Sequence, residues 1–223
     1  LPMIEWLNNI DIELMVFLNS FNNEYFDHVF WMISGKLTWI PLYLTVIAIL
    51  FRKNRKQAIY LLLLTAVLIL LADQISSGII KPLVHRLRPS HTPAIEEILH
   101  YVNGYRGGPF GFVSSHAANT VAFAGFFSLV FGNRTFTVIS ILWALLVSYS
   151  RIYLGVHFPG DILGGLAVGV FAAFVTYFIY RKFSRHKRLD GCCEQPFSGS
   201  DINVATAVLL ANTGIIFIIS AFL

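Results

Sequence analysis

The stretch AIYLLLLTAVLILLADQISSGII, residues 58–80, decides the class of this fold. It is apolar almost without a break as far as Leu71, and only then carries Asp73, Gln74 and two serines. The hydrocarbon core of a bilayer is about 30 Å thick and takes about 20 such residues in a helix. We therefore predict a transmembrane helix here, with polar groups near one of its ends.

The composition of the whole chain agrees with a membrane protein. Of its 223 residues, 56% are hydrophobic and 13% are charged, whereas soluble domains carry roughly 25% charged residues. The same figures exclude a disordered, collagen-like or coiled-coil chain. The only two cysteines, Cys192 and Cys193, are adjacent and too few for a metal cage or a disulfide framework.

Five further apolar segments lie on either side of residues 58–80. They are residues 37–51, which extend back through Met32 and Ile33, and residues 117–131, 136–153, 162–180 and 204–223. We therefore predict an all-α fold, a polytopic membrane helix bundle of about six transmembrane helices.

The first 36 residues are too polar for a simple span. We expect two N-terminal interfacial helices, over residues 10–19 and 25–33, on the outer side of the membrane; one extra distorted span is the alternative. The predicted organisation is interfacial helices in 1–36, a membrane core in 37–180, a basic cytoplasmic linker in 181–203 and an additional C-terminal transmembrane helix in 204–223.

The basic residues predict the orientation of the bundle. The densest basic runs, 52–56 and 181–188, close the first and fifth spans, and the positive-inside rule places both in the cytoplasm. Alternation then puts residues 81–115 and 150–161 on the outer side. In so apolar a chain, the net charge of +4 indicates anionic lipid rather than nucleic acid as the partner.

Basic side chains in the outer segments contradict the orientation rule and call for an anionic ligand. Lys81 and Arg88 are seven residues apart, about two helical turns, so we expect both on one helix face, with Pro89 ending the helix. Such a pair is typical of a phosphate clamp. For Arg86, His91, His100 and Arg106 we favour a solvated loop that contacts lipid phosphates.

Two further clusters lie in these outer segments. Ser114, Ser115 and His116 precede the third span, where a helix N-terminus can bind an anion or where a serine simply caps the helix. In the other cluster, which begins at Ser150-Arg151, His157 is followed four residues later by Asp161. A carboxylate there can accept from Nδ1–H and leave Nε2 free as a nucleophile, although a structural hydrogen bond is the alternative for a lone histidine.

Two of these clusters resemble motifs of the type 2 phosphatidic acid phosphatase superfamily. Lys81 with Arg88-Pro89 fits the first motif, which is lysine, six residues, arginine and proline. The third motif is serine, arginine, five residues, histidine, three residues and aspartate, and residues 150–161 match it completely.

The second motif of this superfamily is normally proline, serine, glycine and histidine. Residues 113–116 keep the serine and the histidine, but Ser115 stands in the glycine position. The resemblance covers roughly residues 37–180, and three ordered motifs at the expected span boundaries make it specific.

The resemblance implies a lipid phosphatase that needs no metal ion and no cofactor. It implies that His157 attacks phosphorus and forms a phosphohistidine, that Asp161 orients His157, and that His116 protonates the leaving oxygen. The residues that the resemblance assigns to the phosphoryl oxygens are Lys81, Arg88, Arg151, Ser114 and the backbone of Ser115.

Two other functions are compatible with parts of this pattern. Soluble vanadium haloperoxidases share the motifs, but the spans argue against them. A lipid transporter or scramblase would not explain the carboxylate partner of His157. We expect a bacterial inner (plasma) membrane enzyme with its site on the periplasmic, outer face. We favour undecaprenyl diphosphate as the substrate, then lipid A, with phosphatidylglycerophosphate as a further alternative.

Overall fold

The computed structural model describes residues 2–186 and 197–223, and every regular element within them is a helix. The α-helices are α1 Pro2–Asn19, α2 Glu24–Ser34, α3 Ile40–Lys53, α4 Arg55–Asp73, α5 Lys81–Val84, α6 Ser115–Phe131, α7 Arg134–Tyr153, α8 Pro159–His186 and α9 Gly199–Ser220. A π-helix, Gln74–Ile80, joins α4 to α5. The prediction of an all-α fold is confirmed.

Four of these helices are long and apolar enough to cross a membrane: the continuous helix Arg55–Val84, then α7, most of α8, and α9. A fifth passage is formed if α2 and α3 are taken together, although the pair is bent by 70°. Helix α6 is apolar but has only 17 residues. The predicted count of about six is reached only when the bent pair and α6 are both included.

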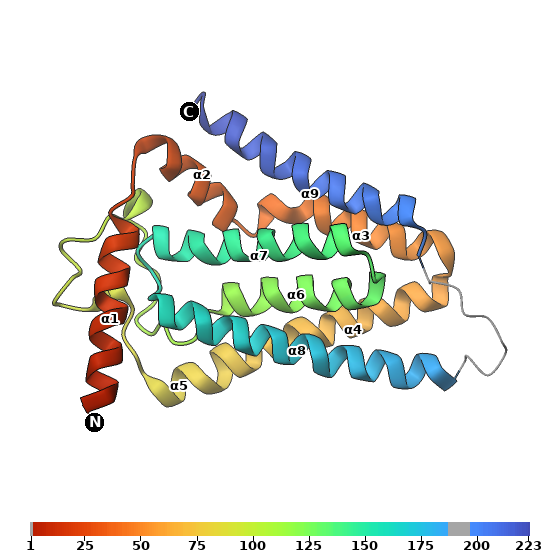
Figure 1. The fold of residues 1–223 in the computed structure, drawn as a ribbon, viewed down its shortest axis with the longest axis horizontal. Helices are drawn as coiled ribbons and strands as arrows, with labels where there is room; N and C mark the ends of the chain where they lie inside the picture. The colour runs from red at the N-terminus through yellow and green to blue at the C-terminus, as the bar shows by residue number, and fades with distance from the viewer. Residues whose placement is uncertain (1, 187–196) are drawn as a thin grey trace.

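The long helices run side by side along the molecule, whereas α1 lies across one end of the bundle (Figure 1). The interfacial role that we predicted for residues 10–19 stays a prediction. Helix α2 instead buries Val29, Phe30 and Ile33 and packs against α7 and α9. The α3–α4 connection, which carries the first basic run, lies at the opposite end of the bundle from α1. Much of the predicted linker, including Cys192 and Cys193, lies outside the described residues.

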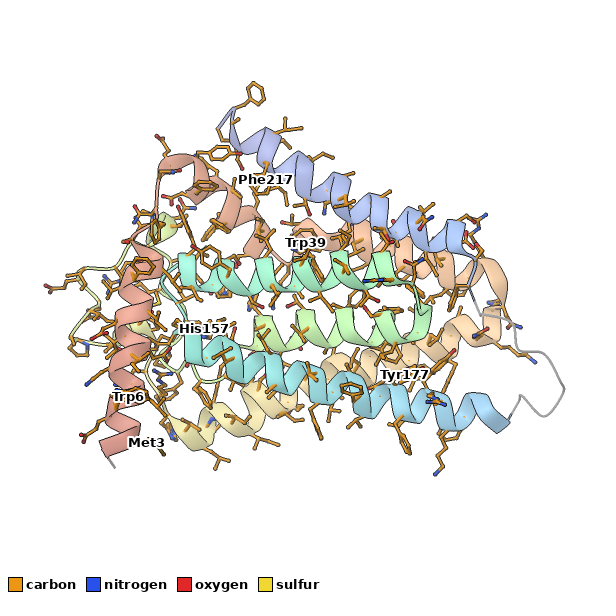
Figure 2. All side chains as sticks on the ribbon, in the orientation of Figure 1. Met3, Trp6, Trp39, His157, Tyr177 and Phe217 are labelled. Carbon is orange, nitrogen blue, oxygen red and sulfur yellow. The ribbon has the colours of Figure 1, made fainter. Side chains whose placement is uncertain are left out.

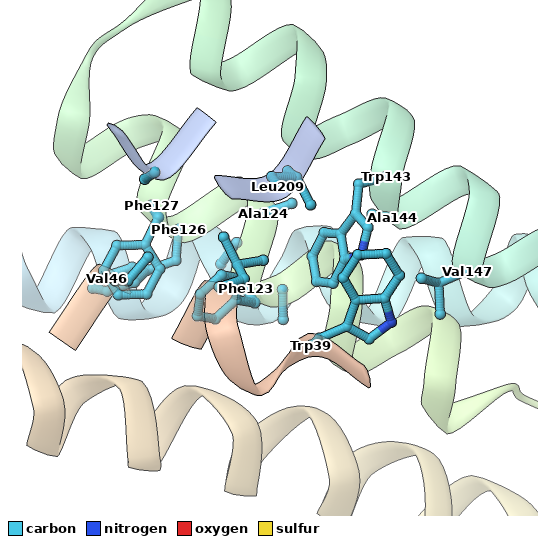
Figure 3. Packing of buried hydrophobic residues seen from close by; sticks show 14 of the residues in the cluster. Trp39, Val46, Phe123, Ala124, Phe126, Phe127, Trp143, Ala144, Val147 and Leu209 are labelled. Atoms are coloured by element: carbon cyan, nitrogen blue, oxygen red, sulfur yellow. The ribbon is translucent and has the colours of Figure 1, made fainter. Parts of the chain in front are cut away.

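An aromatic cluster fills the space between α3, α6 and α7 (Figure 3). The rings of Trp39 and Trp143 meet edge to face with centroids 5.3 Å apart, and Phe123 packs against Trp143 at 6.1 Å. The Trp39 indole N–H also donates to the Ile33 carbonyl oxygen at 3.0 Å. This bond ties the end of α2 to the start of α3 across the bend.

Helices α6 and α8 approach each other closely through glycine and alanine. A Cβ atom on Gly165 would lie 2.5 Å from the carbonyl oxygen of Ser114, and one on Gly169 would lie 2.5 Å from that of Ala118. Small residues four apart allow such backbone approach between membrane helices. This packing brings the start of α6 against the first turns of α8.

We expect Gly165→Leu to destabilise the protein, because the new side chain must separate α6 from α8. Overpacking of this kind costs about 1–3 kcal/mol. Gly214→Leu in α9 is the matched control, because no atom lies within 4 Å of a Cβ built at Gly214. The measurement is the thermal unfolding midpoint of each purified variant in detergent. Equal midpoints for the two variants would show that the close approach of α6 and α8 does not matter.

Candidate functional site

A cavity of about 600 Å³ lies among α3, α4, α6, α7 and the loops at the α1 end of the bundle. Six of the eight site residues predicted from the sequence line it, namely Lys81, Arg88, Ser115, His116, Arg151 and His157. The deeper turns of α3, α4 and α6 contribute mostly apolar side chains, such as Tyr43, Val46, Leu62 and Phe127. The cavity thus combines a cationic end with a mostly apolar remainder, which also carries the acidic side chain of Asp73.

His157 lies in the turn between α7 and α8, at the α1 end of the bundle (Figure 2). Its Nδ1 atom is 3.3 Å from Oδ2 of Asp161, which also accepts the Phe158 N–H at 3.1 Å. Asp161 is completely buried in the first turn of α8. It lies behind His157 and fixes the ring, so that Nε2 faces the cavity.

Burial lowers the pKa of His157 well below its ordinary value, and the nearby charges of Arg88, Arg151 and Lys81 lower it further. The ring is therefore neutral near pH 7. With its one N–H directed at Asp161, the lone pair of the ring is on Nε2. The guanidinium of Arg88 donates to this atom from Nη1 at 3.0 Å.

Arg88 is held beside His157 by main-chain acceptors. Its Nε donates to the Phe110 carbonyl and its Nη1 to the Val156 carbonyl, both at 3.1 Å. These bonds join the loop before α6 to the turn after α7. They leave the positive charge of Arg88 without a carboxylate within ion-pair distance among the described residues.

The expectation that Lys81 and Arg88 share a helix face is wrong. Helix α5 ends at Val84, where His85 takes a left-handed conformation with φ of 51°, and Arg88 follows in extended backbone. Only four of the eight residues from Lys81 to Arg88 are therefore helical, and the 3.6-residue period does not extend to Arg88. Both side chains still reach the cavity, because the loop turns back over its end.

The two serines before α6 have different surroundings. Ser115 Oγ accepts from Lys81 Nζ at 2.8 Å and lies 2.7 Å from Ser77 Oγ, at the cavity wall. Ser114 is completely buried; its hydroxyl caps α6 by accepting from Ala117 N–H at 3.5 Å. The structure therefore gives Ser114 the capping role that the sequence left as the alternative, and does not place its hydroxyl in the cavity.

His116 and Arg151 complete the predicted set. His116 lies in the first turn of α6 and lines the cavity. Arg151 is buried at the end of α7, donates from Nη1 to the hydroxyl of Ser34, and lies 5.7 Å from the ring of Tyr105. Its Nε is buried and has no hydrogen-bond partner among the described residues.

Sequence reasoning missed two cations near the site. Lys36, at the break between α2 and α3, is a fourth cation on the cavity wall. Arg86, which we assigned to a solvated loop, instead donates to Oδ1 of Asp161 at 3.1 Å. No local sequence pattern marks either residue. Lys36 reaches the site through the bend between α2 and α3, and Arg86 reaches it through its distant partner Asp161.

No group of three metal-ligating side chains that could hold an ion occurs within residues 2–186 and 197–223. The independence from metal ions that the resemblance implies stays a prediction.

The chain matches a model of the PAP2 superfamily over residues 59–185. It is 35% identical to the lipid A 4'-phosphatase of Bacteroides thetaiotaomicron over 216 residues, which cover 96% of this chain and 94% of that protein. It is 34% identical to the lipid A 4'-phosphatase of Porphyromonas gingivalis, over 93% of this chain and 89% of that protein.

More distant matches carry other names. The undecaprenyl-diphosphatase of Sulfolobus acidocaldarius is 28% identical over 73% of this chain and 68% of its own length. The crystal structure of a transmembrane PAP2 type phosphatidylglycerolphosphate phosphatase from Bacillus subtilis aligns with a TM-score of 0.58 and 23% identity, over 79% of this chain and 87% of that one. At 23% identity, the match to the Bacillus subtilis crystal structure is evidence for the fold alone.

Proposed function

Because the chain belongs to the PAP2 superfamily, and so is a multi-pass membrane phosphatase of lipid phosphates, we propose that its substrate is lipid A, from which it removes the 4'-phosphate. The observation that carries this proposal is the extent of the similarity to the two lipid A 4'-phosphatases. That similarity takes in most of the chain, including much that lies outside residues 59–185. The comparisons do not support the preference for undecaprenyl diphosphate that we predicted from the sequence, and lipid A, our second choice, fits better.

The cavity suits an amphiphilic phosphate ester. Lys36, Lys81, Arg88 and Arg151 supply positive charge at one end, and mostly apolar side chains line the rest, together with the acidic Asp73. A phosphate bound among the cations would leave the apolar part of a lipid against the apolar wall. This arrangement supports a lipid phosphate in general, and the choice of lipid A rests on the sequence similarity.

We propose a double-displacement mechanism. Nε2 of His157 attacks phosphorus, the bond from phosphorus to the leaving oxygen breaks, and His116, in its imidazolium form with the anionic phosphate bound beside it, donates a proton to that oxygen. Water then attacks the phosphohistidine and gives a proton to His116, which releases inorganic phosphate and restores both histidines. Because phosphoryl transfer spreads negative charge over the equatorial oxygens, fixed cations supply most of the stabilisation.

Arg88 connects the nucleophile to this charge stabilisation. Its guanidinium donates to Nε2 of His157 in the structure, so it lies where the phosphoryl oxygens must approach. A planar fork can bind two of these oxygens at once. Arg151 and Lys81 then face the same group from α7 and from α5.

We also propose that the site faces the periplasm, in a bacterial inner membrane. The support is the separation of the basic runs from the site along the bundle, together with the positive-inside rule. A cysteine in place of the exposed Glu97, in a background with Cys192→Ser and Cys193→Ser, should react with an impermeant reagent in intact cells. Protection of that cysteine until the cells are opened would reverse the orientation.

A substrate panel tests the choice of lipid. We expect the purified protein, in detergent with EDTA, to release phosphate faster from lipid A than from undecaprenyl diphosphate or phosphatidylglycerophosphate. Mass spectrometry of the lipid product should show loss of the 4'-phosphate. Faster turnover of undecaprenyl diphosphate would overturn the lipid A proposal, and release that stops with EDTA would overturn the independence from metal ions.

The two histidines should differ in their dependence on the leaving group. His157→Gln should lower turnover about a thousandfold or more on every phosphate ester, because no covalent intermediate forms. His116→Ala should cost about a hundredfold or more on lipid A but about tenfold or less on nitrophenyl phosphate, because a nitrophenolate needs no proton to depart.

His85→Asn is the matched control for both variants, since His85 is exposed in the same outer loop and asparagine tolerates its left-handed backbone. It should turn over both substrates at the rate of the unmodified protein. Equal proportional losses for His116→Ala on the two substrates would mean that His116 does not donate the proton. Residual turnover in His157→Gln above the stated level would place the nucleophile elsewhere.

A further inference from the structure

Behind the site, a chain of charged groups leads from Asp161 to the N-terminal helix. Oδ2 of Asp161 is used by His157 and by the Phe158 N–H, and Oδ1 accepts from Nη1 of Arg86 at 3.1 Å. Nη2 of Arg86 donates in turn to Oδ2 of Asp11, in α1, at 2.7 Å. Neither Arg86 nor Asp11 belongs to the three sequence motifs.

Asp11 also holds the backbone of the turn that carries the nucleophile. Its Oδ1 accepts the Gly160 N–H at 2.7 Å. A Cβ atom on Gly160 would lie 2.6 Å from Oδ2 of Asp11, so this approach requires glycine. The Asp11 carboxylate thus accepts from both the Arg86 guanidinium and the Gly160 N–H, and Gly160 immediately precedes Asp161.

A second contact ties the other end of α1 to the same region. The amide of Asn19 donates to the Tyr153 carbonyl at 2.8 Å and to the His100 carbonyl at 3.1 Å. Helix α1 is therefore fixed on both sides of the turn between α7 and α8. The helix that lies across the end of the bundle in Figure 1 is bonded directly to the loop of the site.

The electrostatics explain why Asp161 needs this support. A fully buried carboxylate is unfavourable unless it is paired and hydrogen-bonded. Arg86 pairs with Oδ1 and leaves Oδ2 to the histidine, and its guanidinium lies 4.3 Å from the centre of the Phe158 ring. Asp11 keeps Arg86 in this position, away from the cations that line the cavity.

We propose that Asp11 and Arg86 are positioning residues for phosphoryl transfer. They hold the Asp161 carboxylate ionised and aligned with Nδ1 of His157, which makes α1 part of the catalytic apparatus. This inference rests on the proposed function, because it takes His157 as the nucleophile. It adds two residues from outside the motifs to the groups that the reaction needs.

The first experiment compares Asp11→Asn, Arg86→Ala and the double variant with the unmodified full-length protein. The control variants are Glu13→Gln, which is exposed on α1, and Arg106→Ala, whose side chain is half exposed beside Glu96. We expect each single variant to lower kcat on nitrophenyl phosphate about tenfold or more, with KM changed by less than about twofold. The double variant should be no worse than the poorer single variant, because both substitutions break one chain.

Chemical rescue separates a role of the Arg86 charge from a loss of fold. The Arg86 side chain is 23% exposed, so a small guanidinium can reach its place from solvent. We expect millimolar methylguanidinium to restore at least about a third of the lost kcat of Arg86→Ala. It should have no effect on Arg106→Ala. The thermal midpoint of Arg86→Ala should lie below that of Arg106→Ala, because Asp161 loses its buried partner, so recovery of kcat with methylguanidinium is the decisive readout.

Several outcomes would overturn the inference. The inference fails if Asp11→Asn and Arg86→Ala turn over at the rate of Glu13→Gln. It also fails if the losses of kcat add in the double variant, or if methylguanidinium does not restore the kcat of Arg86→Ala. In all of these the unmodified protein still releases phosphate, so the proposed function survives. If the unmodified protein released no phosphate from any ester, the proposed function itself would fail.

Discussion

The buried carboxylate of Asp161 is the constraint on which the outer end of this molecule depends. Its two oxygens accept from His157, the Phe158 N–H and Arg86, and its main-chain carbonyl accepts the Ser114 N–H at 2.9 Å. A buried charge with an unmet hydrogen bond would be strongly destabilising. The turn after α7, the loop before α6 and the start of α6 must therefore all converge on this residue.

That convergence is possible only because α6 and α8 approach so closely. Lipid provides no hydrophobic force between helices, so membrane helices associate through close packing and polar contacts. The glycines at 165 and 169 allow backbone contact between α6 and α8, and the bond from Ser114 to Asp161 lies at the end of the same interface. The alignment of the site therefore depends on the close packing of α6 against α8.

Features encoded within a few residues were predictable from the sequence. The spans follow from hydropathy, the start of α6 follows from Ser114, and the bond from His157 to Asp161 follows from their spacing. Features that depend on irregular backbone or on remote partners were not. The end of α5 at Val84 and the left-handed His85 separate Lys81 from Arg88, which no helical spacing predicts. Asp11 and Arg86 are 75 residues apart, and neither stands in a pattern that points to the other.

The partners of the basic side chains distinguish cations that support the fold from those left to a ligand. Among the described residues, Arg52, Arg86 and Arg106 each have a carboxylate within ion-pair distance. On the cavity wall, Lys81 bonds a serine hydroxyl, Arg151 bonds another, and Arg88 bonds two carbonyls and an imidazole.

Hydrogen bonds to neutral acceptors fix the direction of a cation without cancelling its charge. The cavity therefore retains a positive field at a site of low dielectric, where a dianionic phosphate interacts much more strongly than in water. Arg86 has the opposite arrangement, since its charge is balanced by Asp11 and Asp161. The salt bridge to Arg86 on the protein side of Asp161 offsets the charge of that carboxylate, while its Oδ2 stays bonded to Nδ1 of His157.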